Sequence, residues 1–177
     1  EALEADYWKP IQAGTPTDSD AIRSLAPSVN QVHPEGIALK APMSPHAAAK
    51  LENIDLQAAQ FVLPETENTL IIEGAGGLMV PINDHEFVVN LAHSFDAPII
   101  LVSRNYLGSI NHTLLSIAYL KANNFKIEGI IFNDTTNVET EKFILEHSNL
   151  PCLGRIENLD HVNSASVQDQ AKNITLK

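Results

Sequence analysis

The chain has 177 residues, which suits one domain with a sizeable core. Its 22 acidic and 11 basic residues give a net charge of −11, which argues against nucleic acid or an anionic membrane surface as a partner, because both attract basic surfaces. A single cysteine, Cys152, excludes a disulfide within these residues, and no apolar run approaches the roughly 18 residues of a membrane span. We therefore expect a cytoplasmic protein that works on small molecules, with no nucleic acid and no membrane as partner.

The first half of the chain predicts short elements separated by turns. Residues 6–8 read as a strand that Lys9-Pro10 ends, and a helical pattern begins at Asp20, with Asp18 or Ser19 as its cap. The other elements expected here are a strand at 37–39, a helix at 47–51 that Ser44-Pro45 opens, and a helical segment at 57–62.

The stretch from Thr69 to Gly77 is the most informative part of the sequence. Residues 69–72 are short, apolar and largely β-branched, which predicts a strand buried on both faces. Glu73 follows at the carboxyl end, where open α/β sheets hold their ligands, and the glycines after it let the backbone turn sharply or approach a ligand. A carboxylate before glycines is how nucleotide enzymes hold Mg²⁺ beside phosphate, and the alternative is an exposed Glu in a glycine turn.

The second half alternates strands and helices more clearly. The expected helices are 86–95, 109–123 with Ser109 as its N-cap, 138–147 and 162–172, and the expected strands are 98–103, 127–132 and 151–156. This alternation indicates βαβ units and therefore an α/β fold, doubly wound around a mostly parallel sheet, with residues 1–177 forming a single domain.

Polar residues fall at the predicted carboxyl ends of the strands. Lys9, Glu73, the segment 103–109, Asn133 and Glu157 all lie there, so we expect the site along this edge. Lys9, fixed by the proline after it, can point an ammonium at a phosphate or carboxylate, and the alternative is a solvated lysine. Asp20 is a candidate second carboxylate for a metal.

Taken together, six segments resemble the dethiobiotin synthetase family, ATP-dependent enzymes of biotin synthesis. The resemblance spans roughly residues 5–160, and six motifs in register make it specific. They are residues 7–14 (YWKPIQAG), 19–21 (SDA), 44–46 (SPH), 73–77 (EGAGG), 107–112 (LGSINH) and 132–134 (FND).

The resemblance implies a fold of the P-loop NTPase type and a reaction of diaminononanoate, CO₂ and ATP. Lys9 is implied as the catalytic residue that stabilises carbamate and γ-phosphate charge. Asp20 and Glu73 are implied as ligands of Mg²⁺, which prefers hard oxygen donors. The nucleotide-binding residues implied are Asp20, Glu73, Gly74, Ala75, Gly76, Asn133, Asp134, Glu157, Asn158 and Leu159, of which Asn133 and the backbone of 157–159 read adenine.

The resemblance also implies a homodimer with its site at the interface. The first turn of the helix after Leu107 is implied to hold the substrate carboxylate, from the partner subunit. The substrate-binding residues implied are Ala13, Leu107, Gly108, Ser109 and Asn111.

Three departures qualify this resemblance. No Gly-x-x-x-x-Gly-Lys-Ser/Thr phosphate loop occurs in the 177 residues, so we expect that the first βα unit is either absent or lies before Glu1, and that this chain alone is inactive. Ala13 stands where the family has Ser or Thr, and Glu157 where it often has Pro.

Two alternative functions remain open. One is another P-loop amide-forming synthetase, which Lys9-Pro10 and the 44–46 segment disfavour. The other is a non-catalytic nucleotide-binding or interaction module.

Overall fold

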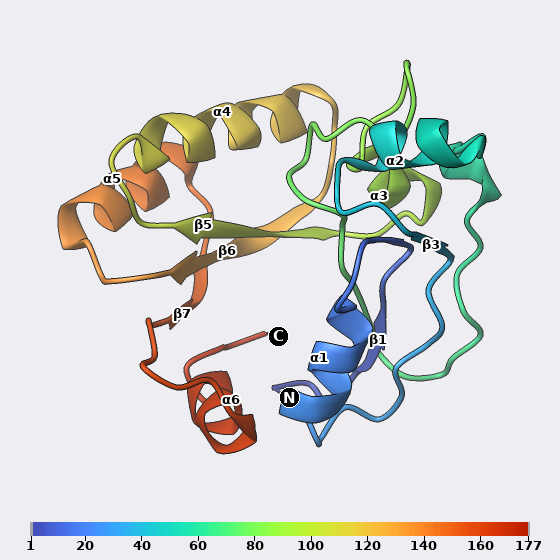
Figure 1. Ribbon diagram of the computed structural model, residues 1–177. Helices are drawn as coiled ribbons and strands as arrows, with labels where there is room; N and C mark the ends of the chain where they lie inside the picture. The colour runs from blue at the N-terminus through green and yellow to red at the C-terminus, as the bar shows by residue number, and fades with distance from the viewer. Residues whose placement is uncertain (1, 177) are drawn as a thin grey trace. The chain divides into compact units, whose positions relative to one another are not determined.

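The computed structural model describes residues 2–176, which gather into two compact units (Figure 1). The first comprises residues 3–96 and the second residues 97–176 together with Ala2, and each unit is described here by itself. The named strands pair in parallel in both units, as the alternation of strands and helices predicted. The α/β class is thus confirmed, whereas the single domain stays a prediction.

The first unit contains two parallel strand pairs, β1 with β4 and β2 with β3. Its elements are β1 (Asp6–Trp8), β2 (Ile11–Ala13), α1 (Asp18–Leu25), β3 (Ile37–Leu39), α2 (Pro45–Glu52), the 3-10 helix η1 (Ala58–Gln60), β4 (Leu70–Ile72) and α3 (Asn90–Ser94). Trp8 lies opposite Ile72, so the next residues of the two strands, Lys9 and Glu73, emerge at the same edge. This register positions the candidate site of the unit.

A hydrophobic cluster that includes Trp8, Ile11, Leu39 and Leu91 forms the core of this unit. Leu70 and Ile72 of β4 pack against this cluster, because alternate residues of a strand face the same side. Ile71 between them is 39% exposed. The prediction of a strand buried on both faces is therefore wrong within the described residues, where the core covers one face.

Two helix starts differ from the prediction. The cap of α1 is Thr17, whose hydroxyl accepts the Asp20 N–H at 3.1 Å, and not Asp18 or Ser19. Helix α3 begins at Asn90 and not at residue 86, because Phe87 forms an antiparallel bridge with Pro81 and donates its N–H to the Asn90 side chain. Ser44 and Pro45 open α2 as predicted.

The second unit is a three-stranded parallel sheet in the order β5-β6-β7 with helices between its strands. Its elements are β5 (Ile99–Arg104), α4 (Ser109–Ala122), β6 (Ile127–Asn133), α5 (Val138–Ser148), β7 (Cys152–Ile156) and α6 (Ser164–Ala171). Ile117 of α4 and Ile144 of α5 pack with Ile130 and Phe132 of β6, so α4 and α5 share one face of the sheet, and Figure 1 shows α4 along β5.

The predicted strands and helices of this unit are confirmed to within two residues at each end. One cap differs, because Gly108 caps α4 in place of the expected Ser109. The backbone of Gly108 has φ +102°, which a glycine adopts without steric penalty. The turn before α4 is therefore built around a glycine and carries no side-chain cap.

Candidate active site

Lys9 lies at the centre of a polar cluster at the carboxyl edge of β1 and β4. Its ammonium donates to Glu73 Oε1 at 2.9 Å and to the Gly74 carbonyl at 3.0 Å, and it pairs with Asp18 Oδ2 at 2.7 Å. Lys9 is only 4% exposed, whereas the side chains of Asp18 and Glu73 are 46% and 45% exposed. A buried cation thus faces two carboxylates that remain open to solvent.

Tyr7 holds the other oxygen of the same glutamate. Its hydroxyl donates to Glu73 Oε2 at 2.6 Å. Burial, followed by the bond to Glu73, raises the pKa of Tyr7 far above its ordinary value, so the phenol stays protonated and stays a donor. Sequence reasoning missed Tyr7, although it lies only two residues before Lys9, a spacing that turns side chains of an extended segment to the same side.

Asp18, and not Asp20, is the aspartate that reaches Lys9. The backbone N–H of Asp18 donates to the buried Gln12 side chain at 3.1 Å, which fixes the first turn of α1 beside β2. Asp20 instead pairs with Arg23 at 2.9 Å on the exposed side of the helix. The structure therefore brings Lys9 and Glu73 together but not Asp20, whose role as a metal ligand stays a prediction.

The glycine-rich segment after β4 keeps its backbone close to Lys9. Gly74 supplies the carbonyl that Lys9 binds, and Gly76 has φ +83°, a left-handed conformation that favours glycine. Ala75 packs against the core cluster. The conformation of residues 74–76 thus depends on these two glycines and on the packing of Ala75. The contact of this segment with nucleotide stays a prediction.

Ala13, the expected substrate contact, is the last residue of β2 and is half-buried. Gly14 after it has φ +77°, and a Cβ at this position would come within 2.6 Å of Pro42 Cβ. The turn therefore requires glycine, whereas Ala13 packs against the core cluster, and its contact with substrate stays a prediction.

The second unit carries a separate group of candidate residues where β6 and β7 end. Asn133 donates to the Ile156 carbonyl at 3.1 Å, and Asp134 binds Arg104 at 2.6 Å and Asn158 at 2.5 Å. The Thr135 N–H, followed by Arg104, lowers the pKa of Asp134. A cavity of about 450 Å³ lies beside these residues, and Asn133, Glu157, Asn158 and Leu159 contribute to its lining.

A buried glutamate that sequence reasoning missed connects three elements of this unit. Glu141 of α5 is 1% exposed and accepts from Asn105 at 2.7 Å and from Arg155 at 2.5 Å. Asn105 follows β5 and Arg155 lies in β7, so one carboxylate joins both strands to α5. The only sequence feature that could have indicated Glu141 is its place in the first turn of a helix. Acidic residues are also common there on helices exposed to solvent, so this feature does not distinguish a buried glutamate.

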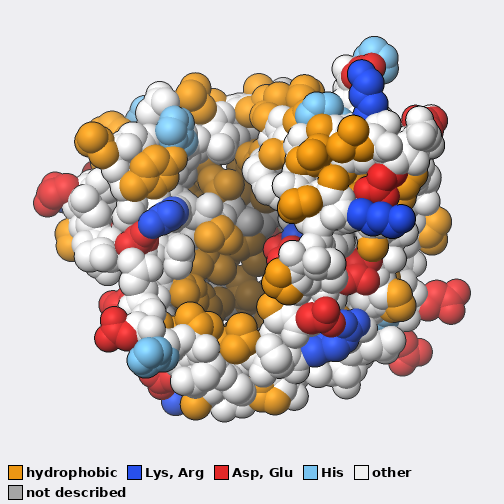
Figure 2. All heavy atoms as spheres, viewed as in Figure 1, with side chains coloured by type: hydrophobic (Ala, Val, Ile, Leu, Met, Phe, Trp, Pro, Cys, Tyr) orange, Lys and Arg blue, Asp and Glu red, His pale blue; other side chains and the backbone are white. Residues whose placement is uncertain are grey.

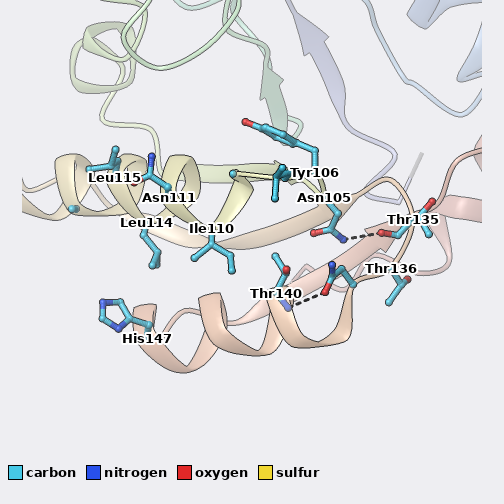
Figure 3. Close-up of a pocket in the computed structure, with 14 residues that line it drawn as sticks. Asn105, Tyr106, Ile110, Asn111, Leu114, Leu115, Thr135, Thr136, Thr140 and His147 are labelled. Carbon is cyan, nitrogen blue, oxygen red and sulfur yellow. Dashed lines mark hydrogen bonds between the residues drawn. The ribbon is translucent and has the colours of Figure 1, made fainter.

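The start of α4 borders a larger cavity of about 1030 Å³, shown in Figure 3. Leu107, Gly108 and Asn111 line it, and Ile110 and Leu114 point from α4 toward α5. Ser109 is buried, and its hydroxyl has no hydrogen-bond partner among the described residues. Three of the four predicted substrate residues here therefore line the cavity and Ser109 does not, and their contact with substrate stays a prediction.

The described residues show three features that bear on possible partners. On the face shown in Figure 2, the Lys and Arg side chains of the described residues are scattered and do not gather into one patch. Within residues 2–176, no group of three or more His, Cys, Asp or Glu side chains is arranged to hold a metal. No described helix is both long enough and apolar enough to cross a membrane.

Parallel strands with polar residues at their carboxyl ends are typical of nucleotide-binding α/β proteins. In agreement, the chain matches the AAA domain family over residues 1–166, which places it in the P-loop NTPase class. Among curated proteins it is 53% identical to the ATP-dependent dethiobiotin synthetase BioD of Cytophaga hutchinsonii over 150 residues, or 83% of this chain and 73% of that protein.

Two further relatives extend the match. The ATP-dependent dethiobiotin synthetase BioD of Christiangramia forsetii is 46% identical over 175 residues, or 97% of this chain and 84% of the relative. The biotin biosynthesis bifunctional protein BioCD of Bordetella avium is 37% identical over 179 residues, or 98% of this chain and 38% of the relative. The chain belongs to the dethiobiotin synthetase family.

Proposed function

We propose that this protein is an ATP-dependent ligase that forms dethiobiotin from 7,8-diaminononanoate and CO₂, with release of ADP and phosphate. Membership of the family supports the reaction as a whole. The observation that carries the proposal is the placement of Lys9, buried yet directed at two solvent-open carboxylates and a glycine-rich backbone.

The proposed reaction has three steps. One amine of the substrate takes up CO₂ and forms a carbamate. A carbamate oxygen attacks the γ-phosphorus of ATP, which gives a carbamic–phosphoric anhydride and ADP. The second amine then attacks the carbonyl carbon, closes the ureido ring and expels phosphate.

Lys9 has a clear task in the second step. The attacking carbamate and the γ-phosphate are both anionic, so they repel each other unless positive charge lies between them. The Lys9 ammonium is held in place by three oxygen atoms, and it needs little reorganisation to stabilise the charge of the transferred group. We propose Lys9 as the catalytic residue for this reason.

Magnesium fits the chemistry of the same cluster. Glu73, Asp18 and the Gly74 carbonyl are hard oxygen donors of the kind that Mg²⁺ prefers, and both carboxylates are open to solvent. We propose that Glu73 and Asp20 hold the ion with water and phosphate, with Asp18 a further candidate. When bound, Mg²⁺ neutralises phosphate charge.

We assign the remaining ligand groups by resemblance and geometry. Asn133, Asp134 and residues 157–159 are proposed to bind the nucleoside, supported by the cavity beside them. Residues 74–76 are proposed to lie along the phosphates, and Ala13 to contact the substrate.

The N-terminus of α4 is proposed to hold the substrate carboxylate. In the proposed homodimer this helix serves the site of the second copy. Leu107, Leu115 and Phe143 are large apolar side chains that are exposed in the single chain, which supports an interface on this unit. A cytoplasmic location is proposed because Cys152 is a free thiol.

Phosphate release tests the proposal. The protein expressed from its natural start, supplied with Mg-ATP and bicarbonate, should release phosphate only when diaminononanoate is added. The 177-residue chain, which contains no phosphate-loop pattern, should release none. Release without the diamine would indicate a different ligase or an ATPase, and the absence of both release and nucleotide binding would favour the interaction module.

A further inference from the structure

The hydroxyl of Tyr7 has no role in the reaction proposed above, yet it is tied to the site. Tyr7 is buried and donates to Glu73 Oε2 at 2.6 Å, while Lys9 donates to the opposite oxygen, Oε1, at 2.9 Å. Tyr7 lies in β1 and Lys9 directly follows the strand, so the two donors are two residues apart. The carboxylate of Glu73 is therefore held at both oxygens by side chains from one short segment.

This double attachment matters because Glu73 has little else to fix it. Its side chain is 45% exposed and stands at the end of a three-residue strand, before glycines that do not restrain it. A glutamate in such a place samples several rotamers unless hydrogen bonds select one. The bond from Tyr7 is a hydrogen bond to a charged group, which is stronger than one between neutral groups.

The Tyr7 hydroxyl and the Lys9 ammonium also differ in the number of oxygen atoms to which they donate. Besides Glu73, the Lys9 ammonium has two other oxygen partners, the Gly74 carbonyl and Asp18. The Tyr7 hydroxyl has one donor hydrogen, and that hydrogen goes to Glu73. Tyr7 therefore donates to Oε2 of Glu73 alone, while Oε1 accepts from Lys9.

We propose that Tyr7 is a positioning residue that orients the Glu73 carboxylate for the magnesium–nucleotide complex. The proposal rests on the assignment of Glu73 as a metal ligand in the proposed function. Tyr7 itself touches neither metal nor substrate. Loss of a hydrogen bond to a metal-binding carboxylate typically weakens metal binding by roughly 10-fold to 100-fold.

Calorimetric titration of nucleotide separates this role from a structural one. ADP is titrated into the natural-start protein once with excess Mg²⁺ and once with EDTA, and the ratio of the two affinities isolates the contribution of the metal. In Tyr7→Phe, which keeps the ring and removes the hydroxyl, we expect this ratio to fall about 10-fold while the affinity in EDTA stays the same. Tyr119→Phe, a hydroxyl removed from the far end of α4, is the control and should leave the ratio unchanged.

A structural role predicts a different result. If Tyr7→Phe lowers the melting temperature but leaves the affinity ratio at the wild-type value, the proposal is overturned. If the ratio falls while the wild-type protein shows no diamine-dependent phosphate release, the positioning role stands and the proposed reaction fails. The two ideas are thus separable.

A second measurement avoids reliance on the Tyr7 variant, should that variant fail to fold. The three tyrosines of these 177 residues can be replaced by 3-fluorotyrosine, and the Tyr7 signal identified by elimination with Tyr106→Phe and Tyr119→Phe. Addition of Mg-ADP should shift the fluorine resonance of Tyr7, whereas ADP in EDTA should not. An identical Tyr7 signal in both conditions would contradict the proposal.

Discussion

Replacing Lys9 by methionine should affect activity far more than folding. Methionine keeps much of the buried aliphatic stem and removes the ammonium together with its contacts to Glu73, Gly74 and Asp18. In Lys9→Met the two carboxylates lose their cation, and the transition state loses the charge that we propose stabilises it.

The magnitude for stability follows from exposure. Breaking a fully buried ion pair costs about 3–5 kcal/mol. Here the carboxylate partners are 46% and 45% exposed, so water can solvate them once the ammonium is gone. We therefore expect the free energy of unfolding to fall by about 1–3 kcal/mol, the range for hydrogen bonds to charged groups and weaker pairs.

The magnitude for activity is larger. Removing one preorganised group that stabilises developing charge lowers kcat by about 100-fold to 1000-fold. Diamine-dependent phosphate release gives kcat, and urea unfolding gives stability on the same preparation. Lys50→Met, at an exposed lysine near the end of α2, is the matched control and should retain both. A folded Lys9→Met protein with less than a 10-fold loss of kcat would refute the role of Lys9.

Three further predictions concern the scaffold. In Gly14→Ala the Cβ meets Pro42 at a positive φ, so stability should fall by about 2 kcal/mol or more in urea unfolding, whereas Gly77→Ala, with no atom within 4 Å of the added Cβ, should not lose it. Glu141→Gln should lower the free energy of unfolding by about 1.5–3 kcal/mol, because the buried carboxylate loses its charged bond to Arg155, and an unchanged value would contradict the role of Glu141 as a link between β5, β7 and α5. Hydrogen bonds from the Thr66 hydroxyl, His33 and two asparagines hold the pKa of Asp6 below its ordinary value. The stability that Asp6→Asn removes should therefore be fully present above about pH 4 and should vanish as the pH falls through the lower folded pKa. A difference in unfolding free energy between wild type and variant that persists at about pH 2 would oppose this.

The positions of Lys9 and Glu73 at strand ends could be predicted from the sequence, because the two short strands before them have clear patterns. Residues 70–72 are all apolar, residues 7 and 8 are aromatic, and a charged residue follows each run, so the pattern places Lys9 and Glu73 at strand ends. The register of β1 with β4 then brings them together. Strands β5, β6 and β7 were equally predictable, since they are longer apolar runs between helices.

The parts that were not predicted depend on contacts distant in sequence. Strand β2 has three residues between Pro10 and Gly14 and is recognisable only from its partner β3. The choice between Asp18 and Asp20 depends on helical phase, because residues two apart in a helix point about 200° apart and cannot both face Lys9. The sequence pattern offers Asp18 as a helix cap and Asp20 as a metal ligand, and the placement of α1 beside β2 is what brings Asp18 to Lys9.

The central claim is that this protein builds a ureido ring from a diamine and CO₂ at the expense of ATP. The most direct test supplies the natural-start protein with diaminononanoate, Mg-ATP and ¹³C-bicarbonate, and analyses the product by mass spectrometry. The account predicts dethiobiotin that carries the label at its ureido carbonyl, formed in step with phosphate release. Phosphate release without labelled dethiobiotin would contradict the proposed reaction, even if Lys9 proved necessary for that release.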